Sequence, residues 1–177
     1  MPSEGEQFIA EFLDQERIKY ITECKISNLK GDEKSYRKAD FYLPKYKVYI
    51  EFYGQWNQSE EANHRYKEKK RIYKSNNIPC VYLYPENLGI IEYSFQKRMI
   101  KELKDLNMRK ELFIFRSRML IMDRGGLFIW LFLALFILIF GDTQWENDKN
   151  TIFVLMGVVV YQLYRLFDGY IKFLKWK

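Results

Sequence analysis

Residues 37–54 read RKADFYLPKYKVYIEFYG, and this stretch decides how the chain should fold. Two runs within it, 39–43 and 47–53, are rich in aromatic and β-branched residues and are separated by Pro44 and Lys45. This composition favours strands, and the short break between the runs favours a hairpin. We therefore expect two neighbouring antiparallel strands here.

The flanking segments extend the hairpin into an α/β domain. Residues 3–16 carry apolar side chains at helical spacing behind Ser3, a favourable N-cap with Glu6 three residues later. Residues 18–26 and 81–84 have strand character, and residues 59–76 form a charged segment with helical spacing. The order helix, strand, hairpin, helix, strand predicts a mixed sheet flanked by helices over residues 1–90.

Each strand of the hairpin carries one carboxylate, Asp40 or Glu51, between apolar neighbours. Acidic residues are depleted inside strands, and burying one is costly unless it is paired or binds a cation. On antiparallel neighbours the two side chains can approach closely, and oxygen ligands of this kind suit Mg²⁺ or Mn²⁺. Ordinary ion pairs explain the spacing equally well: Asp40 would pair with Arg37 or Lys38. Glu51 would then pair with Lys47.

With its surroundings from residue 3 to 88, this stretch resembles the core of the PD-(D/E)xK nuclease superfamily, in particular the branch of very-short-patch repair endonuclease-like proteins and helicase-attached nuclease domains. The resemblance implies a restriction-endonuclease-like fold and a metal-dependent endonuclease. Glu6 matches the family's helical glutamate, Asp40 its aspartate and Glu51 the acidic residue of its Glu-x-Lys motif. By the same resemblance, Asp40, Glu51 and the backbone carbonyl of Phe52 hold Mg²⁺ or Mn²⁺.

The chain departs from the family at the motif lysine, because Tyr53 stands in that position. Some members resemble this chain and draw a lysine from the following helix. Lys70 is the candidate that completes the catalytic set, and Lys67, one turn earlier, is the second choice. Lys67, Lys69 and Gln55 are expected to contact nucleic acid. A solvated basic face that touches phosphate without specificity is the alternative role for the lysines.

Cysteine and histidine usage excludes several other chemistries. Cys24 and Cys80 lie outside any metal-ligand spacing, and His64 is the single histidine, which rules out a multi-histidine metal site. A Ser-His-Asp or Cys-His catalytic set would depend on that one residue in a charged stretch, so we reject it. The polar N-terminus shows no secretory signal, which predicts a reducing compartment and two free thiols.

The last third of the chain has a different composition. Residues 127–140 contain no polar side chain, and residues 151–167 are mostly apolar but interrupted by Gln162 and Arg165. Because about 20 apolar residues span a bilayer, residues 125–177 predict a hairpin of two transmembrane helices with a short tail. A single span followed by a helix on the membrane surface is one alternative. A hairpin buried in a soluble core is another.

Charge predicts how such a hairpin is oriented. Residues 91–124 combine helical apolar spacing with an excess of basic residues, which predicts an amphipathic, basic juxtamembrane helix that serves as a stalk. The connection 141–150 holds Asp142, Glu146 and Asp148 against Lys149. The positive-inside rule then places both termini in the cytoplasm and the chain, as a multi-pass protein, in the cell inner membrane.

Together these features predict a membrane-anchored endonuclease that cleaves nucleic-acid phosphodiester bonds on the cytosolic side. DNA is favoured over RNA, and the other expected partners are the lipid bilayer and either a second copy or a partner protein at the membrane. The anchored architecture suggests defence against foreign DNA.

Two other functions stay open. The first is a catalytically inactive nuclease fold that serves as a binding or scaffold module. The missing motif lysine favours it, and so does the near-neutral charge of residues 1–90, with 15 Lys/Arg against 14 Asp/Glu. The second is a membrane-perturbing effector with a sensing domain, for which Gly157 and Arg165 are the only indications.

Overall fold

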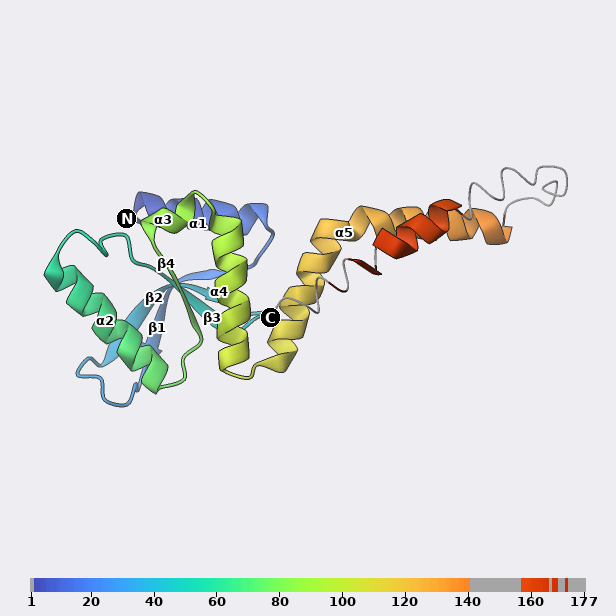
Figure 1. The fold of residues 1–177 in the computed structure, drawn as a ribbon. Coiled ribbons are helices and arrows are strands. Elements are labelled where there is room, and N and C mark those ends of the chain that lie inside the picture. Colours follow the sequence, from blue (N-terminus) through green and yellow to red (C-terminus); the bar gives the residue numbers. More distant parts are fainter. Residues whose placement is uncertain (1, 141–156, 166, 169–170, 172–177) are drawn as a thin grey trace, which may run out of the picture. The chain divides into compact units, whose positions relative to one another are not determined.

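The computed structural model describes residues 2–140, 157–165, 167–168 and 171. Two compact units divide the chain, Met1–Phe115 and Arg116–Lys177. The first unit is an α/β fold in which helices flank a four-stranded mixed sheet (Figure 1). The predicted α/β class and mixed sheet are confirmed.

The strands lie across the sheet in the order of the sequence. The first three pair antiparallel and the fourth pairs parallel with the third: β1 (Ile21–Ser27), β2 (Tyr36–Leu43), β3 (Val48–Phe52) and β4 (Cys80–Leu83). The predicted hairpin is β2–β3, and its register places Phe41 opposite Ile50. Apolar side chains on both strands are buried, which explains why aromatic and branched residues dominate this stretch.

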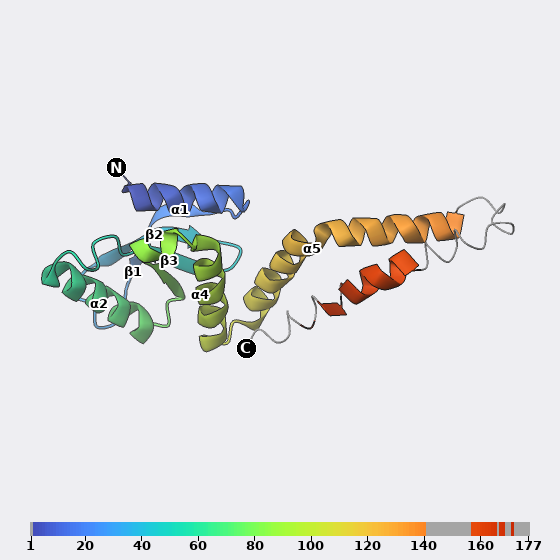
Figure 2. The same cartoon turned by 45° about the horizontal axis from the view of Figure 1, so that its top comes forward.

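The helices begin where their caps predict. In order along the chain they are α1 (Glu4–Gln15), α2 (Glu60–Ser75), α3 (Pro85–Leu88), α4 (Ile91–Asp105) and α5 (Arg109–Phe140). Ser3 and Glu6 form the predicted capping box at the start of α1, and Ser59 accepts a hydrogen bond from the backbone of Ala62 at the start of α2. Figures 1 and 2 show α1 and α2 on different sides of the sheet.

Helix α4 packs beside β4 and belongs to the hydrophobic core. Its Phe95, Met99 and Leu103 are buried, and the ring of Phe95 lies edge-on to Phe12 of α1 with 5.5 Å between the centroids. Sequence analysis placed residues from 91 onward in a stalk, because apolar spacing with basic charge looks the same on a stalk and on a helix that covers a sheet. In the structure the first unit continues past residue 90 and ends at Phe115.

Side chains of α4 also bond the outer edge of β4. Glu102 accepts a hydrogen bond from the backbone N–H of Cys80 at 3.2 Å, and the guanidinium of Arg98 donates to the carbonyl of Tyr82. Backbone groups of an edge strand are otherwise open to pairing with another chain. At the opposite edge, β1 is mostly exposed, and Glu23 in its middle adopts a left-handed backbone with φ of 54°.

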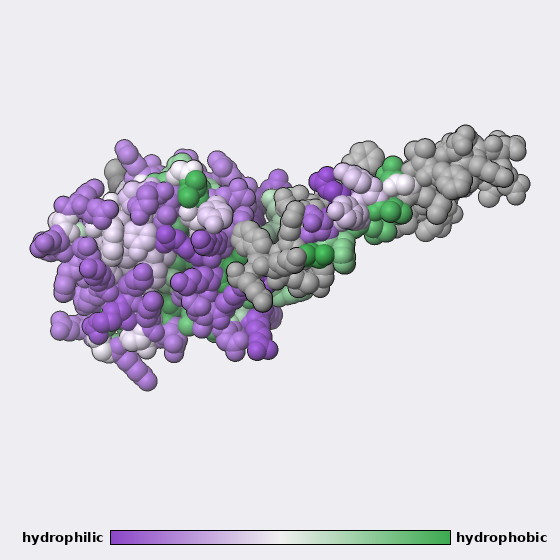
Figure 3. Space-filling model, in the orientation of Figure 1, coloured by the Kyte–Doolittle hydropathy of each residue, from purple (hydrophilic) through white to green (hydrophobic). Residues whose placement is uncertain are grey.

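The second unit contains the later part of α5 and a helical segment over residues 157–165. No helix formed by the residues that the structure describes is long and apolar enough to cross a membrane. The predicted connection 141–150, the start of the predicted second span at 151–156 and most side chains of 127–140 lie outside the described residues. Figure 3 shows hydrophobic residues on the described part of this unit, where Phe132 is 73% exposed.

The placement of α4 in the core can be tested by two neighbouring substitutions in the full chain. Phe95→Ala should lower the free energy of unfolding by about 3–5 kcal/mol, because truncating a buried aromatic side chain leaves a cavity. Tyr93→Ala, at a position that is 54% exposed, should change it by less than about 0.5 kcal/mol. Denaturant unfolding followed by circular dichroism measures both values. Equal effects of the two substitutions would contradict a core position for α4.

Candidate functional site

One open pocket of about 660 Å³ is built by the start of α1, the turn before β2, the hairpin strands and α2. Five of the residues predicted from sequence to form the site line it: Glu6, Asp40, Glu51, Phe52 and Lys69. The structure therefore brings residues from four elements to one place.

Asp40 and Glu51 meet at the end of the β2–β3 ladder. The paired residues end at Phe41 and Ile50, and Asp40 and Glu51 are the next residues of the two strands, close enough for Asp40 to raise the pKa of Glu51. Asp40 Oδ2 accepts a hydrogen bond from the backbone N–H of Phe52 at 2.7 Å. Both carboxylates line the same pocket, as the hairpin predicts.

The ordinary ion pairs considered for these two carboxylates are not formed. The three basic residues that were candidates bond other carboxylates: Arg37 bonds Asp32 and Glu68, Lys38 bonds Glu23, and Lys47 bonds Glu111. Within the described part of the chain, Asp40 has no cation at ion-pair distance. No ion pair among the described residues therefore offsets the cost of partly burying Asp40.

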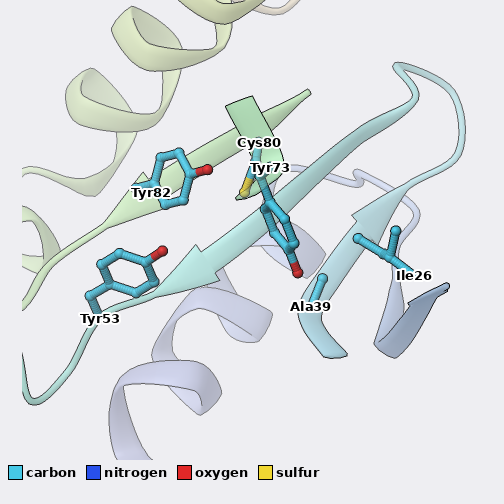
Figure 4. Close-up of a cluster of buried hydrophobic side chains, with 6 residues drawn as sticks. All are labelled: Ile26, Ala39, Tyr53, Tyr73, Cys80 and Tyr82. Carbon is cyan, nitrogen blue, oxygen red and sulfur yellow. The ribbon is translucent and has the colours of Figure 1, made fainter. Parts of the chain in front are cut away.

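Both oxygens of Glu51, which is only 2% exposed, accept hydrogen bonds from α2. Lys69 Nζ donates to Oε2 at 2.5 Å, and the Tyr73 hydroxyl donates to Oε1 at 3.0 Å. The two donors are four residues apart and share one face of the helix. Lys69 Nζ also donates to the carbonyl of Lys38 at 2.7 Å, so this side chain joins α2 to both hairpin strands. Figure 4 shows the Tyr73 ring within the buried cluster, with its hydroxyl directed toward Ala39.

Lys69, and not the predicted Lys70, contacts Glu51. Successive residues of an α-helix are rotated by about 100°, which turns Lys70 away, and its Nζ lies 4.9 Å from the ring centroid of Tyr82. Burial lowers the pKa of Lys70. Sequence analysis could not distinguish the two lysines, because neither charge nor spacing shows which face of α2 meets β3. Lys67 and Gln55 are exposed and do not line the pocket.

Glu6 lies on the first turn of α1, where its carboxylate accepts a hydrogen bond from the Ser3 N–H at 2.8 Å. Gly5 lets this turn approach β3, since a Cβ there would lie 2.1 Å from the ring of Phe52. Glu6 is thus close enough to help raise the pKa of Asp40, although its carboxylate is engaged in the helix cap. Among the described residues, no three His, Cys, Asp or Glu side chains are grouped closely enough to hold a metal ion.

Burial dominates the ionisation of the two strand carboxylates. It raises the pKa of Glu51 to about 7, against the nearby Lys69 ammonium, which lowers it. It raises the pKa of Asp40 to about 6, against the hydrogen bond from Phe52. Two acids that ionise close to neutral pH in one pocket are typical of a functional site.

The donor atoms fit Mg²⁺ or Mn²⁺. Asp40 Oδ1 accepts no hydrogen bond from the described residues, and Glu51 Oε2 accepts one from the ammonium group of Lys69. Mg²⁺ prefers oxygen ligands, keeps several waters and commonly uses only one or two carboxylates together with substrate phosphate. Two carboxylates and the carbonyl of Phe52 meet that requirement without a third acid.

Comparison with protein-family models, with curated proteins and with solved structures finds no match for this chain. The functional interpretation therefore depends on the geometry of the pocket.

Sequence reasoning missed Tyr73, Lys34 and Arg65, all of which contact Glu51 or line the pocket. Tyr73 lies four residues after Lys69, so the helical spacing of α2 points to it once Lys69 is known to face the site. Lys34 and Arg65 carry no such signal, because a turn and a helix far apart in the sequence bring them together.

The raised carboxyl pKa values predict stability that falls with increasing pH. The pKa of Asp40 is about 6 in the folded chain and 3.8 ordinarily, so the folded state holds the proton more tightly. The free energy of unfolding should therefore decrease as pH rises between these two values. Asp40→Asn should raise the melting temperature at pH ~8 and leave it nearly unchanged at pH ~4, measured by thermal unfolding in EDTA.

The exposed Glu33 supplies the control, and Glu33→Gln should show no pH-dependent gain. A melting temperature for Asp40→Asn below that of the unmodified chain at both pH values would contradict a half-buried carboxylate without an ion-pair partner.

Proposed function

We propose that this chain is a membrane-anchored, Mg²⁺-dependent endonuclease of the PD-(D/E)xK type. One observation carries the proposal: Asp40, Glu51 and Lys69, from two paired strands and the following helix, line a single pocket. This arrangement supports the variant of the family pattern in which a lysine from the helix replaces the one missing from the strand.

The roles of the residues follow from their positions. Asp40, Glu51 and the carbonyl of Phe52 would hold the cation, which when bound activates water and stabilises charge on the phosphate. Lys69 carries an ammonium group beside Glu51, where it orients the attacking water or offsets charge that develops on the phosphate. Tyr73 positions Glu51 by its bond to Oε1.

Two adjacent lysines provide a matched test of this mechanism. Lys69→Gln should lower the rate of plasmid cleavage in Mg²⁺ by about 10²–10³-fold, the usual effect of removing one group that stabilises transition-state charge. Lys70→Gln, one residue along the same helix, should stay within about threefold of the unmodified chain, because Lys70 packs on Tyr82. Gel-based cleavage by the full chain measures both rates.

Glu51→Gln and EDTA should each abolish cleavage in the same assay. Cleavage that survives either treatment would refute the metal site, and equal losses for the two lysine variants would refute the role of Lys69. Circular dichroism of Glu51→Gln shows whether the variant is folded, so that a lost site is distinguished from a lost fold.

A catalytically inactive binding module is the second candidate. It is favoured by one observation, that Lys69 and Tyr73 already satisfy both oxygens of Glu51. Such a module would bind nucleic acid equally well in Mg²⁺ and in EDTA, without cleavage. The plasmid assay, combined with a binding measurement, separates the two functions.

We propose further that residues 125–177 enter a bilayer as a helical hairpin. The all-apolar composition of 127–140 supports this proposal, and so do the exposed hydrophobic side chains of the second unit, such as Ile129 at 66% and Phe132 at 73%. Basic residues before the hairpin and after it favour a cytosolic location for both termini at the cell inner membrane.

A nuclease held at the bilayer would meet DNA as it enters the cell. The proposed biological role is therefore defence against foreign DNA, carried out by a homo-oligomer or together with a partner protein at the membrane. This role rests on the proposed anchoring rather than on any residue of the pocket.

Membrane insertion can be tested by fractionation. The full chain should stay with membranes through an alkaline carbonate wash and be released by detergent. Replacing Leu131 and Leu133 together with arginine should release it, because each charge at the centre of a span costs about 2.5–3.5 kcal/mol of insertion free energy. Phe113→Arg, on an exposed residue before the apolar stretch, should have no effect. Release of the unmodified chain by carbonate would contradict a spanning hairpin.

A further inference from the structure

The pocket is larger than a cation site requires. A divalent ion with about six water-sized ligands occupies roughly 200 Å³, at about 30 Å³ for each water. The pocket measures about 660 Å³, and side chains other than the two carboxylates also line it. Among them are Lys34 and Ser35 from the turn before β2, Tyr36 at the start of β2, and Arg65 from α2.

Two of the basic side chains that line the pocket are not paired with a carboxylate. Five basic side chains line the pocket, and three of them bond carboxylates: Arg37 bonds Asp32 and Glu68, Lys38 bonds Glu23, and Lys69 bonds Glu51. Lys34 and Arg65 have no carboxylate at ion-pair distance among the described residues. These two cations are therefore available to an anion from outside the chain.

An ion-pair network around Arg37 joins the two segments that carry these residues. The guanidinium of Arg37 is 4% exposed and bonds Asp32 in the turn and Glu68 on α2, at 2.6 and 2.8 Å. Lys34 lies three residues before Arg37, and its backbone N–H donates to Asp32. Arg65 lies three residues before Glu68, on the same face of α2. The Arg37 network thus joins the segments that carry Lys34 and Arg65 before any ligand binds.

We propose that Lys34 and Arg65 form a second phosphate subsite, which makes the substrate a polynucleotide contacted at a phosphate next to the one that is cleaved. This inference rests on the proposed function. An ammonium and a guanidinium both form charge-assisted hydrogen bonds with phosphate oxygens, and the Ser35 hydroxyl adds a further donor. A compound with a single phosphodiester fills only the part of the pocket beside Asp40 and Glu51.

Binding of a fluorescently labelled single-stranded oligodeoxynucleotide to the full chain in EDTA tests the subsite without any cleavage. Lys34→Ala and Arg65→Ala should each weaken binding several-fold and reduce the slope of log affinity against log salt by about 1. The matched controls are Lys30→Ala in the same turn and Arg71→Ala on the same helix, since neither residue lines the pocket. Slopes that match those of the controls would overturn the inference.

Hydrolysis of bis(p-nitrophenyl) phosphate, which has one phosphodiester, gives a second readout. Lys34→Ala and Arg65→Ala should leave this hydrolysis unchanged and raise KM for the oligonucleotide, whereas Lys34→Arg and Arg65→Lys should restore KM. Equal losses on both substrates would show that the two residues support cleavage at Asp40 and Glu51 instead, and would overturn the subsite. If the unmodified chain hydrolyses neither substrate, the proposed function fails, and the salt slopes still decide the subsite.

Discussion

The burial of Glu51 within the sheet is the constraint on which the first unit depends. A carboxylate that is 2% exposed needs partners, and α2 supplies both of them through Lys69 and Tyr73. Lys69 also bonds the carbonyl of Lys38, so one side chain connects β2, β3 and α2. The contacts of Lys69 and Tyr73 that hold α2 against the sheet are therefore the same contacts that determine the chemistry of the pocket. A substitution that changes the packing of α2 also changes the environment of Glu51.

Tyr53, which directly follows β3, contributes to the same arrangement. Its ring is fully buried and stacks on Tyr66 of α2 with 4.1 Å between ring centroids. Its hydroxyl donates to the carbonyl of Tyr66 at 3.3 Å. This aromatic side chain at the end of β3 thus strengthens the packing of α2. The same packing brings Lys69 of the helix to Glu51 of the strand.

Sequence reasoning predicted the features that depend on local pattern. The hairpin, the helix cap at Ser3 and the pairing of Asp40 with Glu51 in one pocket follow from alternation and spacing within short segments. The choice between Lys69 and Lys70 depended on the rotation of α2 about its axis, which only tertiary packing determines. Packing of α4 in the core of the first unit was not predicted for a similar reason, because the apolar face of residues 91–105 does not reveal whether protein or lipid covers it.

The two edge strands of the sheet, β1 and β4, differ in what limits further strand pairing. Glu102 bonds the Cys80 N–H and Arg98 bonds the Tyr82 carbonyl, so these two groups of β4 are not available to a further strand. At β1, Glu23 has a left-handed backbone and is absent from the register with β2, which interrupts the ladder there. Both edge strands therefore offer an imperfect template to another strand, which disfavours edge-to-edge association of two copies.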